Sequence, residues 1–400
     1  MSKLKKILFI QYTNPSAYPP LERAAQLLAE QGWHVLFLGT GAWGKANEFE
    51  FPPHDRIQAR KISFCPPGWR QKLHYFRFLL WNVLWTIYWR PQWIYASDLR
   101  SCPIALVLSF IPRLRIIYHE HDSPSEPSKR IERFFDWTRT RLSMRTCKNI
   151  LPNETRVNRF LEKTKSNRKN VMTIFNCPSL KTVSLPKVSK SEVIWILYQG
   201  SLNPARLPFS ILEALTFLPP TIKLRIIGYE TVGHLSYVKQ LKLKAEKLKI
   251  QERISIVDAM PYYDSLRSYI SASDIGLALM PKQTTDFNEQ TMAGASNKAF
   301  DYLANGLALL VSDLPEWKKM FVEPGFAYAC DPASPNSIAE NLKKMIAAPE
   351  DMRKMGERGR QKIIKEWNYE KQFSPVFNTL VSSATPSFSR KRENVVRGAG

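Results

Sequence analysis

Lys298 and Asp301 are the residues whose types and spacing most clearly suggest chemistry. They lie in the segment Ala293–Trp317, AGASNKAFDYLANGLALLVSDLPEW, which predicts a loop, a short helix ending at Gly306, a buried strand and a second loop. Residues three apart share one face of a helix. A cation and a carboxylate near the positively polarised start of a helix suit a nucleotide diphosphate, with Lys298 binding phosphate and Asp301 binding ribose hydroxyls. The spacing also fits an ordinary exposed ion pair, and both interpretations stay open.

The short helix and the strand after it would position these two side chains. Ser296 or Asn297 can cap the helix, because a short polar side chain accepts hydrogen bonds from the first turn. Apolar residues recur at helical spacing from Phe300 to Ala304. Leu307–Val311 is an unbroken apolar run, which is typical of a parallel strand buried on both faces.

The same segment resembles the nucleotide-sugar signature of the glycosyl transferases group 1, a large group of retaining glycosyltransferases with the GT-B fold. In that family a strand–loop–helix carries two acidic residues separated by seven others. Asp301 falls on the second acidic position, which binds ribose in the family, and Ala293 falls on the first. Ser-Asn-Lys before Phe300 resembles a subgroup with the pattern P/S-N-K-x-F-E-Y. The resemblance extends from Lys6 to about Leu380 and implies transfer of a sugar from a nucleotide-diphosphate donor with retention of configuration.

Two glycine-containing turns extend the expected donor site. The first contains Gly200 directly after a strand, where the backbone can approach a ligand, and Arg206, which can fork onto a diphosphate. In the family this loop binds the donor phosphates through a basic pair, and the resemblance implies that Lys298 shares that task with Arg206. The second turn contains Gly228 and resembles the family's Gly-x-Gly, with Glu230 in place of the second glycine. Both turns also fit ordinary connections between a strand and a helix.

Titratable residues follow a strand in the first half of the chain. His119, Glu120, His121 and Asp122 come directly after the strand Arg115–Tyr118, at its carboxyl end. The resemblance implies that His119 lies against the transferred sugar, and we assign Glu120 to the acceptor side. A buried core histidine is the ordinary alternative, and a metal site made by His119, His121 and Asp122 is a further one.

Two other residues are assigned to the acceptor side. Asp98 follows another strand, where relatives carry a polar residue near the acceptor, although a helix cap is an equal alternative. The first loop, Asn14–Pro20, lacks the glycine pair of many relatives, so we expect Tyr18 to shape that side. Because no Asp-x-Asp occurs in the sequence, we expect no metal and no other cofactor. Arg206, Lys298 and a helix N-terminus would stabilise the leaving phosphate.

Strands that alternate with helices predict an α/β protein with two doubly wound, Rossmann-like domains facing a central cleft. The predicted acceptor-side domain is 1–178, and a linker, 179–192, joins it to a nucleotide-sugar-binding domain, 193–365. A helix at 366–381 is expected to cross back to the first domain. Residues 382–400 are expected to form a disordered basic tail.

The composition indicates a basic cytoplasmic protein. Five scattered cysteines without C-x-x-C spacing indicate reduced core thiols. The formal net charge is +23, and most of the excess lies in the first 200 residues, which predicts anionic partners. Basic residues do not cluster with aromatic ones in an RNA-binding motif, so we expect no nucleic acid partner.

The stretch 66–90 predicts either a core helix or a helix at a membrane surface. Phe78–Trp89 is apolar except for Asn82 and Thr86 and is too short to span a bilayer. We expect one face to lie at the inner surface of the membrane and the other in the core; the outer face would carry Trp81, Trp85 and Trp89, and the core face Leu79, Leu80, Val83, Leu84 and Ile87. Four basic residues would lie near anionic lipid: Arg70, Lys72, Arg77 and Arg90.

These features together predict a glycosyltransferase that acts on a glycan or lipid-linked acceptor, in the synthesis of a surface polysaccharide or glycolipid. One alternative is a nucleotide-sugar epimerase of the same fold, which would need no acceptor cleft. Another is a non-catalytic protein that binds anions or nucleic acid, which the high charge and Ala293 would fit.

Overall fold

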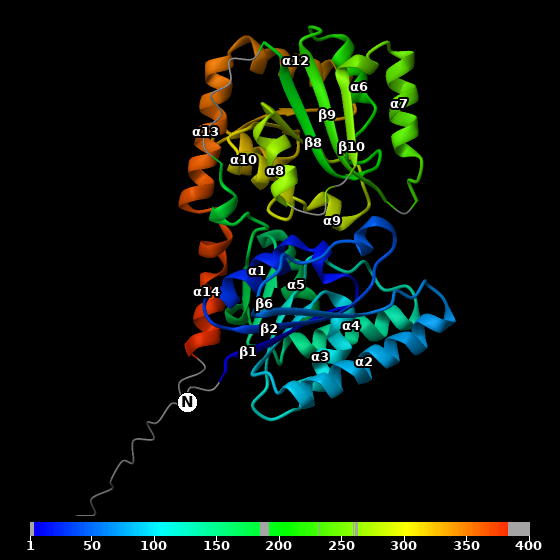
Figure 1. Cartoon of the computed structure of the whole chain (residues 1–400), viewed down its shortest axis with the longest axis vertical. Coiled ribbons are helices and arrows are strands. Elements are labelled where there is room, and N and C mark those ends of the chain that lie inside the picture. Colours follow the sequence, from blue (N-terminus) through cyan, green and yellow to red (C-terminus); the bar gives the residue numbers. More distant parts are fainter. Residues whose placement is uncertain (1–3, 185–191, 232, 259, 261–262, 383–400) are drawn as a thin grey trace, which may run out of the picture.

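A computed structural model describes residues 4–184, 192–231, 233–258, 260 and 263–382 of the chain, and shows two α/β domains stacked end to end (Figure 1). All strand pairs are parallel, which confirms the predicted pair of doubly wound domains. In each sheet the strand order reverses beside the first strand of the domain, and ligands of such folds bind at this point, beyond the carboxyl ends of the strands.

The first sheet has the order β3-β2-β1-β4-β5-β6-β7. Its strands are β1 (Lys6–Gln11), β2 (His34–Thr40), β3 (Ile57–Ile62), β4 (Trp93–Ser97), β5 (Arg115–His119), β6 (Lys148–Leu151) and β7 (Val171–Thr173). Its helices are α1 (Pro19–Glu30), α2 (Trp69–Trp89), α3 (Cys102–Leu108), α4 (Arg130–Ser143) and α5 (Glu154–Thr164).

The second sheet has the order β10-β9-β8-β11-β12-β13. Its strands are β8 (Ile194–Leu202), β9 (Ile222–Glu230), β10 (Ile254–Asp258), β11 (Ile275–Ala278), β12 (Ala308–Ser312) and β13 (Ala327–Cys330). The helices that follow β8 are α6 (Ser210–Thr216), α7 (Tyr237–Lys247), α8 (Tyr263–Ser271), α9 (Phe287–Gln290), α10 (Asn297–Ala304), α11 (Pro315–Trp317), α12 (Pro335–Ala347), α13 (Pro349–Lys365) and α14 (Tyr369–Ser382).

Two strands found in the structure, β3 and β13, were not expected from the sequence. Both lie at sheet edges. β3 has four exposed residues out of six, so it lacks the continuous apolar pattern of a strand buried on both faces. β13 is only four residues long, which is too short to give a clear pattern.

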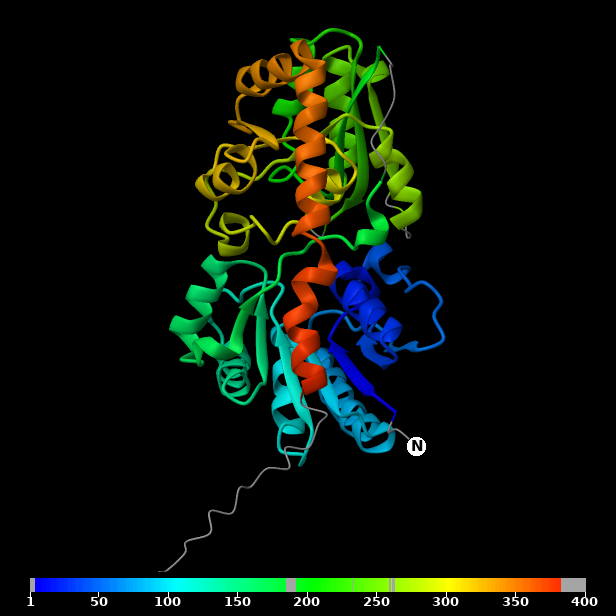
Figure 2. The ribbon, with the colours of Figure 1, turned by 90° about the vertical axis from the view of Figure 1, so that its left-hand side faces the viewer.

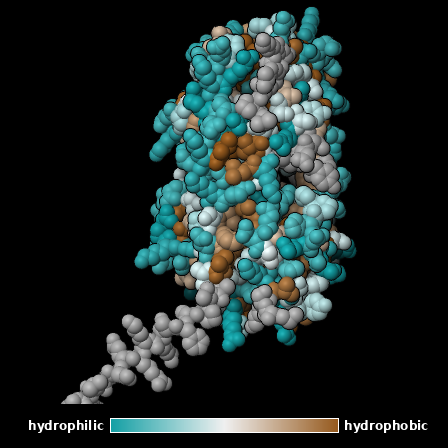
Figure 3. Space-filling view, turned by 60° about the vertical axis from the view of Figure 1, so that its left-hand side comes forward, coloured by the Kyte–Doolittle hydropathy of each residue, from teal (hydrophilic) through white to brown (hydrophobic). Residues whose placement is uncertain are grey.

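The last helix joins the second domain back to the first. Figure 2 shows α13 along the second domain and α14 continuing past the boundary onto the first. Tyr369, Phe373 and Val376 of α14 are buried in one apolar cluster with Ile7 and Phe9 of β1. The face that carries α13 and α14 is largely hydrophilic, with separate hydrophobic patches (Figure 3). Half of the expected linker, 185–191, and nearly all of the expected tail, 383–400, lie outside the described residues.

The expected orientation of α2 is wrong. Trp81, Trp85 and Trp89 are half-buried and pack against the core, whereas three residues expected in the core are exposed: Leu80, Leu84 and Ile87. The fully buried side chains of this helix are Phe78, Asn82 and Thr86. The bulky indole rings can cover the edge of the core because each of them is large enough to reach it from a flank of the helix. No helix in the described part of the chain is long and apolar enough to cross a membrane.

Candidate active site between the two domains

A cavity of about 450 Å³ lies between the two domains. The first domain contributes η1 (Pro15–Ala17) and α1, and the second contributes the ends of β8 and β9 and the start of α10. Every residue assigned to the donor site from the sequence lines this cavity: Gly200, Arg206, Gly228, Ser296, Asn297, Lys298 and Asp301. The predicted turns therefore meet at one place, since the carboxyl ends of parallel strands share one edge of a sheet.

Asp301 lies at the base of this cavity in a network of hydrogen bonds. Its Oδ1 accepts from Nη2 of Arg23 at 3.3 Å, and its Oδ2 accepts from Nε2 of Gln199 at 3.2 Å. Burial raises the pKa of Asp301 to about 6, although Arg23 and Gln199 lower it. Each carboxylate oxygen has a second lone pair, so the group can still accept hydroxyl hydrogens from a ligand.

Lys298 provides a positive charge without an acidic partner among the described residues. Its Nζ lies 4.1 Å from the centroid of the Tyr198 ring, in a cation–π contact. Burial, together with the charge of Arg206, lowers the pKa of Lys298 well below its usual value. The exposed-pair interpretation is thus wrong for Lys298 and Asp301, because Asp301 is paired with Arg23 instead. A phosphate entering the cavity would supply the missing anion.

Two glycines allow the backbone of β8 and β9 to reach the same place. Gly200 has φ +119°, a conformation that favours glycine, and a Cβ there would lie 3.6 Å from Nζ of Lys298. Gly228 is opposite Gly200 in the sheet, and a Cβ on it would lie 1.9 Å from the Gly200 carbonyl oxygen. A side chain at Gly228 would therefore force the strands apart.

Arg206 and the start of α10 complete the second domain's side of the cavity. The guanidinium of Arg206 donates to Sδ of Met280 and lies 3.8 Å from Oε1 of Glu289. Ser296 is the N-cap residue of α10, but its side chain makes no capping hydrogen bond. Unfilled backbone N–H groups at a helix start favour an anion. Neither Glu289 nor Met280 was identified from the sequence, since no pattern links them to Arg206.

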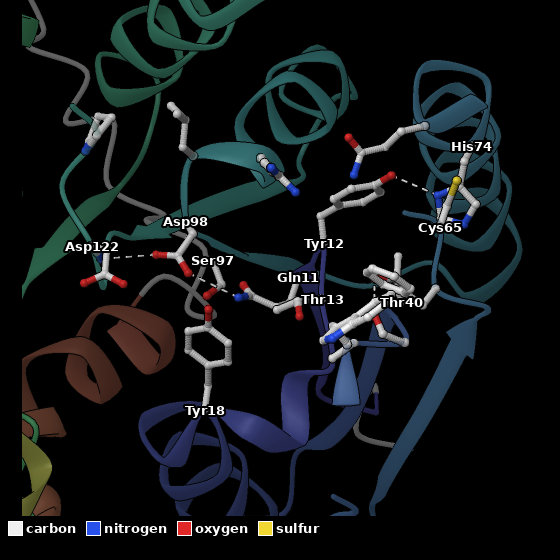
Figure 4. A pocket seen from close by; sticks show the side chains of 18 of the residues that line it. Gln11, Tyr12, Thr13, Tyr18, Thr40, Cys65, His74, Ser97, Asp98 and Asp122 are labelled. Atoms are coloured by element: carbon white, nitrogen blue, oxygen red, sulfur yellow. Dashed lines mark hydrogen bonds between the residues drawn. The ribbon is translucent and has the colours of Figure 1, made fainter. Parts of the chain in front are cut away.

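A second cavity, of about 500 Å³, lies within the first domain at the carboxyl ends of β1 and β4 (Figure 4). Asp98 is part of its wall and is held by three groups: the backbone N–H groups of His121 and Asp122 and the side-chain amide of Gln11. Burial raises the pKa of Asp98 to about 6. The side chain does not cap the helix that follows, so the structure does not support the cap interpretation.

The segment Ser16–Pro19 separates the two cavities. Ser16, Ala17 and Pro19 line the cavity between the domains, whereas Tyr18 lines the second cavity, where Figure 4 shows its ring beside Asp98. The ring of Tyr18 also lies 5.5 Å from that of His121. A sugar transferred between the two cavities would therefore pass next to Tyr18.

The two histidines after β5 have different surroundings. His119 is fully buried, lines neither cavity, and shares a hydrogen bond of 2.6 Å between Nδ1 and the hydroxyl of Tyr95. The ring of His121 lies against that of His119, with centroids 3.9 Å apart and the planes tilted by 40°, and neither of its ring nitrogens is bonded to any described residue. Burial lowers the pKa of both, to about 4 for His121. His121 does not line either cavity itself, but it lies beside Tyr18, which does, and is therefore nearer than His119 to a sugar bound there.

Glu120 points away from both cavities, which argues against its assignment to the acceptor side. It is fully buried and forms two contacts with Arg139, between Nε and Oε2 at 2.5 Å and between Nη2 and Oε1 at 3.0 Å. Side chains of successive residues in an extended segment point to opposite sides. Because His119 and His121 lie on one side, Glu120 must lie on the other.

The residue at the first acidic position of the family motif, Ala293, forms part of the contact between domains. Its carbonyl oxygen accepts a hydrogen bond of 2.9 Å from Nδ2 of Asn153 at the start of α5. Arg156 in the same helix donates to the carbonyl of Asn288 and to the hydroxyl of Thr291. The side chains of Asn153 and Arg156 thus hold the loop before α10 against the first domain, and no local sequence pattern predicts these contacts.

No group of three or more histidine, cysteine, aspartate or glutamate side chains in the described ranges is arranged to hold a metal ion. Glu120, between the two histidines, is ion-paired with Arg139.

Comparison with known proteins gives this geometry a context. Residues 184–362 match the family model described as Glycosyl transferases group 1. No curated protein matches the chain. Among solved structures, Anabaena Alr3699/HepE in complex with UDP and glucose is similar over 94% of this chain and 100% of that chain, with 16% identity and a TM-score of 0.70.

Two further structures have the same architecture. Sucrose-phosphate synthase from Thermosynechococcus elongatus is similar over 95% of this chain and 100% of that one, at 14% identity and a TM-score of 0.69. WaaG, a glycosyltransferase involved in lipopolysaccharide biosynthesis, is similar over 94% and 99%, at 12% identity and a TM-score of 0.66. At these identities the likeness shows the fold, and this chain has the GT-B fold.

Residues 184–362, which carry most of the second domain's side of the cavity, match the model of the glycosyl transferases group 1. The resemblance first drawn from the segment around Asp301 is thereby confirmed, and family and fold together support glycosyltransferase activity.

Proposed function

We propose that this protein transfers a sugar from a nucleotide-diphosphate sugar to a glycan or lipid-linked acceptor, with retention of configuration and without a metal or other cofactor. The observation that carries the proposal is the convergence of two cations, a buried carboxylate and a glycine-lined strand edge in one cavity between the domains. Solvated surface residues would not produce this combination, and each part matches one part of a nucleotide sugar.

The donor would be held by its ribose and its diphosphate. Asp301 would accept hydrogen bonds from the ribose hydroxyls, and Lys298 with Arg206 would bind the diphosphate. The HepE structure contains UDP and glucose, so UDP and UDP-glucose are the first compounds to test. Tyr229, which also lines the cavity, offers a ring to the base.

The reaction would proceed on one face of the sugar. The bond between the anomeric carbon and the phosphate oxygen breaks, a new bond forms from that carbon to the acceptor oxygen, and the acceptor proton moves to the leaving phosphate. Negative charge develops on that phosphate, where Lys298, Arg206 and the start of α10 stabilise it. His121, supported by His119 behind it, would position the sugar.

The second cavity favours transfer over epimerisation, because an epimerase needs no room for an acceptor. Its wall combines a buried carboxylate, Asp98, with the aromatic side chains of Tyr18 and Trp43. Pockets that hold a ligand in one orientation usually have such a mixture of apolar surface and a few polar groups. We therefore place the acceptor here.

The cellular role that fits this activity is the synthesis of a surface polysaccharide or glycolipid, in the cytoplasm and at the inner face of the membrane. The basic first half of the chain supports this assignment, since cytoplasmic membrane surfaces are anionic.

Isothermal titration calorimetry with UDP, UDP-glucose and free uridine tests the donor site. We expect UDP to bind and uridine to bind at least tenfold more weakly, because uridine lacks the diphosphate. Equal affinity for UDP and uridine would contradict the site. Measuring UDP release in the presence and absence of a chelator then tests metal independence. NMR of the product's anomeric proton tests retention of configuration.

A further inference from the structure

Helix α2 presents apolar side chains to the solvent as well as to the core. Its fully buried side chains are Phe78, Asn82 and Thr86, and the last two donate to the carbonyls of Phe78 and Asn82 one turn earlier. The exposed face, called the apolar face below, carries Trp69, Leu73, Phe76, Leu80, Leu84 and Ile87. A helix that meets water normally carries polar side chains on its outer face. The pattern therefore indicates an apolar environment outside the protein.

The neighbouring helix α4 extends this surface. Tyr75 of α2 contacts Phe135 of α4, with ring centroids 5.4 Å apart, and the two helices lie side by side in Figure 1. On α4 the residues Ile131, Phe134 and Trp137 are each about half exposed. Exposed apolar patches of this extent on one domain mark a binding surface.

The charge around the apolar face selects an anionic partner. The sequence contains no aspartate or glutamate from Arg56 to Ser97, although this stretch includes the whole of α2. Basic side chains lie exposed on both helices, including Arg70 and Arg77 on α2 and Arg133 on α4. An apolar strip edged by cations matches a bilayer whose surface carries anionic lipid. A soluble protein partner would not require a stretch of this length without carboxylates around α2. On α4, Glu132 accepts from the backbone N–H of Lys129 at the helix start and Asp136 pairs with Arg139.

The apolar face also lies next to the proposed acceptor cavity. Gln71 and His74, on another side of α2, line that cavity. The Nε2 of His74 lies 2.9 Å from the carbonyl oxygen of Ser63, and its Nδ1 lies 2.8 Å from the hydroxyl of Tyr12. One helix thus forms both a wall of the cavity and the surface beside it.

We infer that the apolar face of α2, with the adjoining part of α4, is a docking surface for an anionic lipid bilayer. The role of this docking rests on the proposed function. Docking would bring the headgroup of a lipid-linked acceptor to the second cavity while the acyl chains of the acceptor stay in the membrane. The docking residues differ from the tryptophans expected at the membrane from the sequence, because those tryptophans pack against the core.

Sedimentation with vesicles tests the surface without any substrate. Vesicles of phosphatidylglycerol and phosphatidylcholine are compared with vesicles of phosphatidylcholine alone, at 0.05 M and 0.5 M salt. We expect binding to the anionic vesicles at low salt and release at high salt. Arg77→Gln and Arg133→Gln should each weaken that binding about fivefold, as expected for one cation near an anionic surface.

Leu84→Glu tests the apolar contact, and Leu235→Glu is its matched control. The two leucines are equally exposed, at 64% and 65%, but Leu235 belongs to the second domain. We expect Leu84→Glu to weaken vesicle binding at least tenfold and Leu235→Glu to leave it unchanged, with both variants keeping the thermal midpoint of the wild type. Unchanged binding by Leu84→Glu, or equal losses in both variants, would overturn the inference.

Two other results would also overturn it. The first is that the wild-type protein stays in the supernatant with anionic vesicles at low salt. If the protein still binds UDP, the proposed function is retained and only the docking surface is ruled out. The other is a wild-type dimer in analytical ultracentrifugation that Leu84→Glu converts to a monomer, which would assign the apolar face to self-association.

Discussion

Arg23 and Asp301 form a buried ion pair that connects the two domains at the cavity between them. Nη2 of Arg23, in α1, lies 3.3 Å from Oδ1 of Asp301, in α10. Nη1 of Arg23 donates to the carbonyls of Asn176 and Cys177 and to the side chain of Asn297. A residue of the first domain thus orients the carboxylate expected to bind the donor's ribose.

Replacing Asp301 should weaken donor binding while the fold survives. Asp301→Asn should cost about 1–3 kcal/mol of UDP binding free energy, because hydrogen bonds from the ribose hydroxyls to a charged acceptor are lost. Calorimetry with UDP measures the loss. Asp313→Asn, which alters an exposed carboxylate outside the cavity, is the control. Unchanged UDP affinity in Asp301→Asn would remove ribose recognition from this residue.

The affinity for UDP should depend on pH through two groups. Since the pKa of Asp301 is raised to about 6, the carboxylate becomes protonated as pH falls below 6, and binding should weaken there. Since burial lowers the pKa of Lys298, its charge is lost as pH rises, and binding should weaken at the alkaline side as well. A bell-shaped profile is expected. Arg23→Gln should move the acidic limb to higher pH, because the guanidinium lowers the pKa of Asp301; a purely structural role would leave that limb in place.

Arg206 should act on the diphosphate and not on the nucleoside. Arg206→Ala is expected to weaken UDP binding by about 1–3 kcal/mol and to leave uridine binding unchanged, because only the phosphates meet the guanidinium. Parallel titrations with the two ligands separate these effects. An equal loss for both ligands would indicate a distorted cavity instead.

The two histidines should differ in what their removal changes. His121→Ala is expected to lower kcat with little effect on UDP affinity, since a contact with the sugar matters mainly in the transition state. His119→Ala should also lower kcat if it supports His121, but it should lower the thermal midpoint as well, because its hydrogen bond to Tyr95 is buried. A fall in kcat for His119→Ala alone would restore His119 as the residue that touches the sugar.

Asp98 should make the folded state less stable as pH rises. Its folded pKa, about 6, lies above the ordinary value of an unfolded chain, so the stabilisation present at low pH is lost as pH rises through 6. Between pH 5 and pH 7 this loss should be about 1 kcal/mol. Unfolding in urea at the two pH values measures this loss. Asp98→Asn should remove the pH dependence of the free energy of unfolding, whereas Asp351→Asn, at an exposed site, should not. The same variant should lower kcat/KM for the acceptor.

The sequence by itself determined several residues of the second domain that line the cavity between the domains. Gly200, Gly228 and the residues from Ser296 to Asp301 each follow from a local pattern: a strand, a turn that brings the backbone close to a ligand, or the first turn of a helix. Such patterns depend on residues a few positions apart. The order of strands then brings their ends together, because all parallel strands of a sheet end at the same edge.

Only the tertiary structure decided the contacts between residues distant in the chain. Arg23 meets Asp301 across 278 positions, and Asn153 meets Ala293 across 140. The direction of Glu120 depended on Arg139 on another helix, and the orientation of α2 depended on which of its faces found room against the core. Hydrophobic burial is non-directional. An apolar run such as Phe78–Trp89 therefore predicts that apolar surface will be covered, but it does not predict which partner covers it.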